Sequence, residues 1–187
     1  EHGAYVMGPE IRDLEAKLAA YCGVKHAVAC ASGTDALLMA LMALGIGRGD
    51  AVFTTPFTFM ATAEVVSLLG ATPVFCDIDA ATFNMDPADL DAVIARTRKE
   101  RPELTPRAVI SVDLFGLPCD YDAVEAVCAK HKLTLIEDAA QSFGGRYKGR
   151  MCCSFGAIAC TSFFPAKPLG CYGDGGMCFT DSDELKD

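Results

Sequence analysis

The sequence is short of positive charge. Its 187 residues carry 16 lysines and arginines against 25 aspartates and glutamates, which gives a formal net charge of −9. The basic residues cluster only at 96–101, in the segment RTRKER. A nucleic acid or an anionic membrane is therefore a poor match as a main partner, because both are bound through concentrated positive charge. A phosphate-bearing ligand would have to be held locally, by backbone N–H groups and a few placed cations.

Two further absences narrow the class of protein. The chain has no uninterrupted apolar run long enough to span a bilayer, and no signal peptide opens it. Its ten cysteines form no C-x-x-C pair, and the adjacent Cys152 and Cys153 are poorly placed for chelation. We therefore expect a cytoplasmic protein with reduced thiols, no membrane partner and no metal site.

What is present is the composition of a globular domain. Hydrophobic residues make up 51% of the chain and charged residues 22%, which is enough to bury a sizeable core. The chain starts at Glu1 rather than at Met, and its last segment, 181–187, has the caps and acids of a helix start. We expect residues 1–187 to form one large domain of a longer polypeptide.

Strand-like and helix-like segments alternate along the chain. The patterns predict helices at 11–23, 33–45, 61–70, from 86 onward and at 121–131, and strands at 27–32, 51–56, 73–78, 108–115, 133–138, 157–164 and 175–180. Such alternation indicates an α/β fold, with a mostly parallel sheet covered by helices on both faces in three α/β/α layers. Ligands of such sheets bind beyond the carboxyl ends of the strands.

Two strand ends carry polar groups that suit a ligand. In ASGTDAL at 31–37, a strand runs into a helix through Gly33 and Thr34, whose N–H groups could cradle a phosphate. The same residues could simply start a helix well. In IEDAAQS at 136–142, Asp138 ends an apolar strand and Gln141 follows three residues later. That carboxylate could orient a cation, or it could serve only as a helix cap.

The third strand end holds Lys167, between two prolines in TSFFPAKPLGCYGDGG at 161–176. Ser162 comes just before this loop. A lysine near a buried pocket can act as a nucleophilic amine, although an edge-loop lysine that reaches into solvent is the plainer interpretation. A phosphate cradle, an acid and a lysine together are what pyridoxal phosphate needs. Phe57 follows another strand and could stack on the cofactor ring, or it could be a core aromatic.

The order SGTDAL, PFTFMATAE, EDAAQ and TSFFPAKPLG-x-x-GDGG resembles the DegT/DnrJ/EryC1/StrS family of sugar aminotransferases, from about Gly8 to the end of the chain. The resemblance implies the fold of aspartate aminotransferase, pyridoxal-phosphate fold type I, with 1–187 as the large domain and a small C-terminal domain beyond it. It also implies a role for each candidate residue: Lys167 as Schiff-base lysine and proton carrier, Asp138 as partner of the pyridine nitrogen, Gln141 near the ring hydroxyl, Gly33, Thr34 and Ser162 on the phosphate, and Phe57 on the ring face.

The resemblance further implies a reaction. Glutamate gives its amine to the cofactor and leaves as 2-oxoglutarate, and the amine then passes to a keto group on a nucleotide-linked sugar. FFPAKPLGCYGDGG is most similar to enzymes that aminate the 3-keto position of UDP-linked N-acetylhexosuronic acids for O-antigen or lipopolysaccharide synthesis. Family members form dimers that build each active site from both subunits.

Other functions remain open at this point. A lyase or desulfurase of the same fold type would share the cofactor, and a truncated, non-catalytic relative could bind a ligand without turning it over. CDID at 76–79 could be the D-x-D site of a glycosyltransferase, but a turn after a strand explains it as well. GIGRGD at 45–50 is not a dinucleotide fingerprint, because it lies between a helix and a strand.

Overall fold

The computed structural model describes residues 3–4 and 6–187. The helices are α1 (Pro9–Cys22), α2 (Gly33–Ala43), α3 (Ala61–Leu68), α4 (Pro87–Glu100), α5 (Tyr121–His131) and α6 (Asp183–Lys186), with a short 3₁₀ helix at Leu114–Gly116. The strands are β1 (His26–Cys30), β2 (Asp50–Thr54), β3 (Thr72–Phe75), β4 (Thr105–Val112), β5 (Thr134–Asp138), β6 (Arg146–Tyr147), β7 (Arg150–Met151), β8 (Ile158–Ser162) and β9 (Gly176–Thr180).

Seven strands form one sheet in the order β1-β9-β8-β5-β4-β2-β3. Neighbouring strands from β3 to β8 are parallel, whereas β9 pairs antiparallel with both β8 and β1. Because β9 alone is reversed, the carboxyl ends of the other six strands lie at one edge of the sheet. The predicted mostly parallel α/β fold is confirmed.

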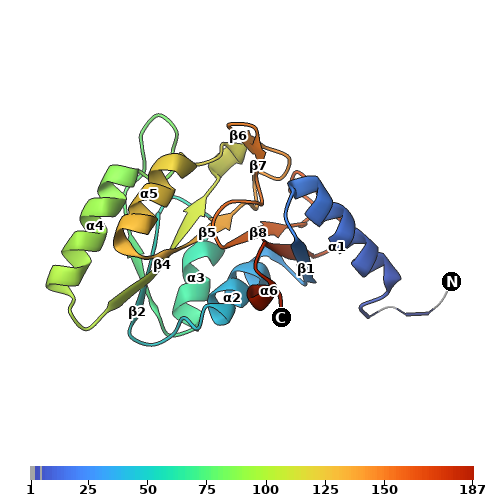
Figure 1. Ribbon diagram of the computed structural model, residues 1–187, viewed down its shortest axis with the longest axis horizontal. Coiled ribbons are helices and arrows are strands. Elements are labelled where there is room, and N and C mark those ends of the chain that lie inside the picture. Colours follow the sequence, from blue (N-terminus) through green and yellow to red (C-terminus); the bar gives the residue numbers. More distant parts are fainter. Residues whose placement is uncertain (1–2, 5) are drawn as a thin grey trace.

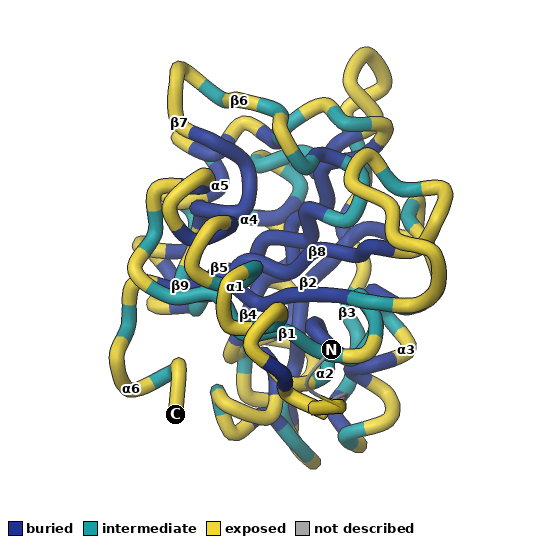
Figure 2. Tube along the Cα trace, turned by 90° about the vertical axis from the view of Figure 1, so that its right-hand side faces the viewer, coloured by how far each residue is buried: buried dark blue, intermediate teal, exposed yellow. Residues whose placement is uncertain are grey.

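Helices cover both faces of this sheet (Figure 1). Successive residues of β5 point to opposite faces, as strand geometry requires. Leu135 packs in the cluster that holds α4 and α5, and Ile136 packs in the cluster that holds α2 and α3. Helix α1 covers the β8–β9 end through Leu18 and Cys22. Figure 2 shows the outcome, a buried sheet enclosed by helices and loops with exposed outer sides.

Local signals explain where the helices begin and end. Asp86 and Asp120 cap α4 and α5 by accepting backbone N–H groups with their side chains. Gly23 ends α1 in the left-handed conformation, with φ of 77°. Among the described residues, no helix combines the length and the apolar character needed to cross a membrane.

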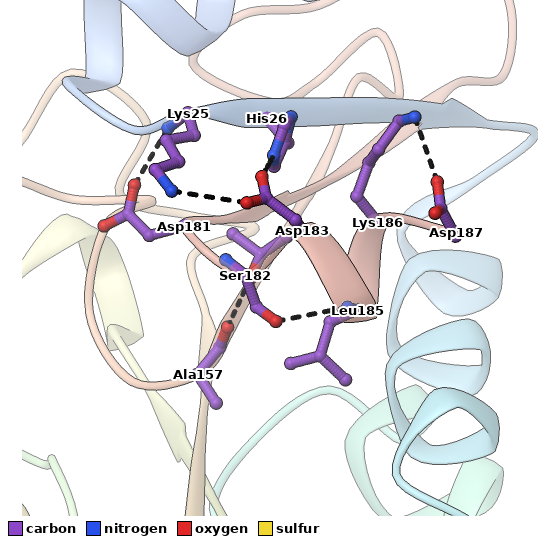
Figure 3. Close-up of polar contacts among 10 residues, drawn as sticks. Lys25, His26, Ala157, Asp181, Ser182, Asp183, Leu185, Lys186 and Asp187 are labelled. Atoms are coloured by element: carbon purple, nitrogen blue, oxygen red, sulfur yellow. Dashed lines mark hydrogen bonds and ion pairs between the residues drawn. The ribbon is translucent and has the colours of Figure 1, made fainter.

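The C-terminal turn is fastened to β1 by polar contacts (Figure 3). Ser182 caps α6, as the segment 181–187 predicts, by accepting the N–H of Leu185. Asp183 lies 2.7 Å from Nε2 of His26, and the backbone N–H of Lys25 donates to Asp181 at 2.8 Å. The hydrogen bond with His26, followed by the charge of Lys25, keeps the pKa of Asp183 below its ordinary value.

The fold differs from the expected elements at several strand ends and in one added hairpin. Strand β3 ends at Phe75 rather than at residue 78, and β8 ends at Ser162 rather than at residue 164. A short hairpin, β6–β7, lies between β5 and β8, where the sequence offered no strand pattern. Strand β4 ends at Val112 rather than at Phe115, because Asp113 turns the chain into the 3₁₀ helix and its N–H donates to the carbonyl of Asp138. This early turn brings the loop after β4 against the end of β5.

Candidate active site

A cavity of about 510 Å³ opens at the carboxyl edge of the sheet. Six of the seven sequence-predicted residues line it together: Gly33, Thr34, Asp138, Gln141, Ser162 and Lys167. They come from the last residues of β5 and β8, from the loops that follow these strands, and from the first turn of α2 after β1, which the parallel arrangement brings to one edge. The topology therefore gathers groups that lie up to 134 residues apart, from Gly33 to Lys167.

The first turn of α2 forms one wall of the cavity. Ser32 caps the helix in an extended conformation and accepts the N–H of Asp35 at 3.0 Å. The N–H groups of Gly33 and Thr34 belong to the first turn, where a helix offers no internal carbonyl acceptor. A Cβ on Gly33 would lie only 2.6 Å from Cβ of Ser162, so glycine lets the helix end approach β8 closely. This wall therefore presents the N–H groups of Gly33 and Thr34 and the hydroxyls of Thr34 and Ser162, a set that suits an anion.

Asp138 is the buried acid of the site, with 6% of its surface exposed. Oδ2 accepts the hydroxyl of Thr62 at 2.9 Å, and Oδ1 accepts the N–H of Ala140 at 3.2 Å. Burial raises the pKa of Asp138 and the charge of Asp113 raises it further, while the two hydrogen bonds and Lys167 lower it. Within the described part of the chain, its hydrogen-bond donors are neutral, so a cationic N–H in the cavity would suit this carboxylate.

Lys167 reaches the cavity from a tightly turned loop. Its backbone N–H donates to the carbonyl of Phe164 at 2.8 Å, and the N–H of Phe164 donates to Oγ of Ser162 at 3.2 Å. A further bond, from the N–H of Cys171 to the carbonyl of Phe163 at 2.8 Å, closes the loop. The lysine is half-buried and lies near enough to Asp138 to lower the pKa of that carboxyl. Backbone hydrogen bonds therefore hold the loop that carries Lys167.

Gln141 lines the cavity and also holds the loop after β4. Its Oε1 accepts the N–H of Phe115 at 2.7 Å. Phe115 has φ of 56°, an uncommon conformation for a bulky residue, so this bond supports a strained position.

Phe57 lies outside the set of residues that line the cavity. It packs instead against Phe83 and Phe115, with ring centroids 5.7 and 6.3 Å away. Phe59, two residues later, lines the cavity together with Thr62. Sequence inspection missed both of these residues. The motif PFTF gives no signal that separates Phe59 from Phe57, because both are phenylalanines of one loop.

A second group of buried acids lies beneath the site. Glu137 accepts the N–H groups of Cys153 and Phe155, each at 2.7 Å. Asp113 accepts the hydroxyl of Tyr121 at 2.8 Å, along with other donors. Burial raises the pKa of both carboxyls, and the charge of Asp113 raises the pKa of Glu137 further. These acids connect the strand ends rather than face the cavity.

The residues of the cavity fit pyridoxal phosphate. The α2 wall is built for an anion, Asp138 is a buried acceptor for a cationic N–H, and Lys167 supplies an amine in the same cavity. The sequence profile described as the DegT/DnrJ/EryC1/StrS aminotransferase family matches residues 1–187. The chain belongs to this family.

Relatives within the DegT/DnrJ/EryC1/StrS family agree with the fold and the motifs. The UDP-2-acetamido-2-deoxy-3-oxo-D-glucuronate aminotransferase of Pseudomonas aeruginosa is 53% identical over 98% of this chain and 49% of its own length. A crystal structure of a family member from Brucella abortus matches with a TM-score of 0.97 and 55% identity, over 99% of this chain and 49% of that one. NtdA from Bacillus subtilis, solved with bound cofactor PMP, matches with a TM-score of 0.83 and 31% identity, over 97% and 39%.

These matches confirm the fold class and the family resemblance. They also show that the chain spans about half the length of the DegT/DnrJ/EryC1/StrS relatives it matches.

Proposed function

We propose that this chain is the cofactor-binding large domain of a pyridoxal-phosphate-dependent aminotransferase, which moves an amino group from glutamate to a keto group of a nucleotide-linked sugar. The observation that carries the proposal is a single cavity shared by Lys167, the buried carboxylate of Asp138 and the first turn of α2. The activity named for the Pseudomonas aeruginosa relative favours a UDP-linked 3-keto hexuronate as the acceptor.

Each wall of the cavity has a part in holding the cofactor. Pyridoxal phosphate, when bound, supplies an aldehyde that exchanges amines and a ring that withdraws electrons from the attached carbon. The N–H groups of Gly33 and Thr34 would hold the phosphate, with the hydroxyl of Ser162 beside them. Asp138 would accept the N–H of the ring nitrogen and keep it protonated, because a negative partner favours the cationic form. Gln141 would contact the ring hydroxyl.

Lys167 would perform the proton transfers. Among the described residues that line the cavity, it alone carries an amine. Nζ of Lys167 would hold the cofactor through the aldehyde that the cofactor supplies. The same Nζ would move a proton between the amino-acid carbon and the cofactor carbon in each half of the reaction. The backbone bonds of its loop would keep Nζ within reach of both positions.

We further propose a cytoplasmic homodimer whose active sites are shared between subunits, serving the synthesis of O-antigen or lipopolysaccharide aminosugars. The small C-terminal domain and the second subunit would complete the contacts to glutamate and to the sugar nucleotide. Support comes from the relatives, since the chain spans about half of their length. An exposed apolar set around the cavity mouth is consistent with a covered surface: Phe57, Phe59, Met60, Phe115 and Phe164.

The first test is an absorption spectrum of the full-length protein with pyridoxal phosphate, before and after addition of glutamate and, separately, of borohydride. We expect a visible band that glutamate removes, and a borohydride-trapped adduct on Lys167. Lys167→Ala should lose both the band and the adduct, because no other cavity-lining residue offers an amine. Lys99→Ala, which changes an exposed lysine of α4, is the control and should keep both. A band that survives in Lys167→Ala would overturn the assignment.

A further inference from the structure

We propose that Thr62, backed by Thr58, is a positioning residue that orients Asp138 toward the ligand in the cavity. Neither threonine belongs to the set of residues singled out from the sequence motifs. Both line the cavity, and they reach it from the loop before α3 and from its first turn. The inference rests on the proposed function for the identity of the ligand, but the contact between Thr62 and Asp138 is a property of the chain itself.

The hydrogen bonds run in one direction. Oγ1 of Thr62 lies 2.9 Å from Oδ2 of Asp138 and 3.0 Å from Oγ1 of Thr58. A hydroxyl has one proton to donate, and an ionised carboxylate has none. The proton of Thr62 therefore goes to Asp138, and Thr58 donates in turn to Oγ1 of Thr62. Both hydroxyls donate in the direction of the carboxylate, so the bond from Thr58 to Thr62 strengthens the bond from Thr62 to Asp138.

This arrangement fixes the orientation of the carboxylate. Thr62 is fully buried and holds one oxygen, while the N–H of Ala140 holds the other at 3.2 Å. The two anchors come from different elements, Thr62 from α3 and Ala140 from the turn after β5. A carboxylate bound at both oxygens cannot rotate freely about its Cβ–Cγ bond. Its remaining lone pairs keep a constant direction relative to the cavity.

The hydroxyls also act on the charge of Asp138. Burial raises the pKa of this carboxyl, and the bond from Thr62 is the largest of the influences that lower it. The ionisable groups around it are Asp113 from the loop after β4, Lys167 and Asp174 from the cavity wall, and the thiol of Cys160 on β8. Asp113 opposes ionisation and Lys167 favours it. Without Thr62, only the N–H of Ala140 and the charge of Lys167 would remain among these influences to favour the ionised form.

The first experiment measures the contact without any cofactor. The ¹³C-carboxyl resonance of Asp138 is titrated in the full-length protein, with Asp138→Asn identifying the signal. Thr62→Val keeps the shape of the side chain but removes the hydroxyl, and we expect it to raise the midpoint by about one pH unit or more. Thr62→Ser keeps the hydroxyl and should titrate like the wild type. An unchanged midpoint in Thr62→Val would overturn the proposal.

The second experiment measures the effect on the loaded protein. We expect Thr62→Val to slow the glutamate half-reaction about tenfold or more with little change in KM, and to move the pH dependence of the visible band. Thr62→Ser should restore the rate to within about threefold. Thr54→Val is the matched control, because Thr54 is equally buried but donates to the carbonyl of Ile110, away from the cavity.

The outcomes separate the two proposals. If Thr62→Val shifts the titration of Asp138 but the wild type shows no Lys167-dependent band, the role of Thr62 is supported and the proposed function is overturned. Equal losses of rate in Thr62→Val, Thr62→Ser and Thr54→Val, with unchanged pH dependence, would mean that Thr62 only supports packing.

Discussion

Phe57 and Phe59 stand two residues apart in one loop, but only Phe59 lines the cavity. We expect Phe59→Ala to weaken the binding of pyridoxal phosphate by about twofold to tenfold, because an aromatic pair contributes about 0.5–1.5 kcal/mol beyond its buried area. Phe57→Ala also removes a phenylalanine side chain, but from the Phe57–Phe83–Phe115 cluster, and it should leave the affinity for the cofactor unchanged. The measurement is a fluorescence titration of each variant with the cofactor.

The reverse ranking of these two variants would favour Phe57, rather than Phe59, as the stacking residue. Sequence alone selects Phe57 because it is the first aromatic after β2, and the motif does not say how the loop turns. The backbone of the loop and the start of α3 at Ala61 decide which side chain faces inward. Residues on strand ends, such as Asp138 and Ser162, escape this problem because a strand fixes their direction.

At the scale of secondary-structure elements, the site depends on how closely α2 approaches β8. Gly33→Ala would place a Cβ 2.6 Å from Cβ of Ser162, so the helix end must move away from the strand. We expect a loss of about 1–3 kcal/mol in the free energy of unfolding, as in other overpacked sites, and weaker binding of the cofactor. Urea unfolding and cofactor titration of the same samples measure the two effects.

Gly47→Ala is the matched control for this substitution. Its Cβ would meet only the carbonyl of Leu69, at 3.9 Å, so we expect a change within about 0.5 kcal/mol. Equal stability and equal cofactor affinity in the Gly33 and Gly47 variants would show that α2 does not need glycine at its start.

The elements themselves follow from the sequence more readily than their pairing does. Capped starts and apolar runs predict the large helices and strands, and the parallel edge follows from their alternation. The reversed direction of β9 and its place between β1 and β8 depend on long-range pairing that no local pattern encodes. The hairpin β6–β7 has only two residues in each strand, too few for an alternating pattern.

At the scale of the whole molecule, buried acids link the sheet to the loops beneath the site. Sequence inspection did not single out Asp113 or Glu137, because an acid inside an apolar strand gives no sign of its partners. Asp113 accepts the hydroxyl of Ser142 at 2.7 Å and Glu137 holds the N–H of Cys153 at 2.7 Å, so together they connect β4, β5 and the segment before β8. Burial is the main cause that raises the pKa of each carboxyl.

These raised pKa values predict how stability depends on pH. Above the ordinary carboxyl pKa of about 4, the unfolded chain loses protons that the folded chain still holds. The free energy of unfolding should therefore fall as pH rises from about 4 to the raised pKa of the pair, by about 1.4 kcal/mol for each unit of difference. Acids whose pKa is lowered, such as Asp91 and Asp183, act in the opposite direction and only below about pH 4.

Asp113→Asn tests this dependence. Its amide oxygen can still accept the N–H of Cys119 and the hydroxyl of Tyr121, and its NH₂ group can donate to Ser142. Because Asp113 helps to raise the pKa of Glu137, removing its charge should flatten the fall in stability with pH. Urea unfolding between pH 5 and pH 8, with the exposed Asp13→Asn as control, measures the slopes. Parallel slopes in wild type and Asp113→Asn would contradict the prediction, because they would mean that Asp113 does not contribute to the pH dependence of stability in this range.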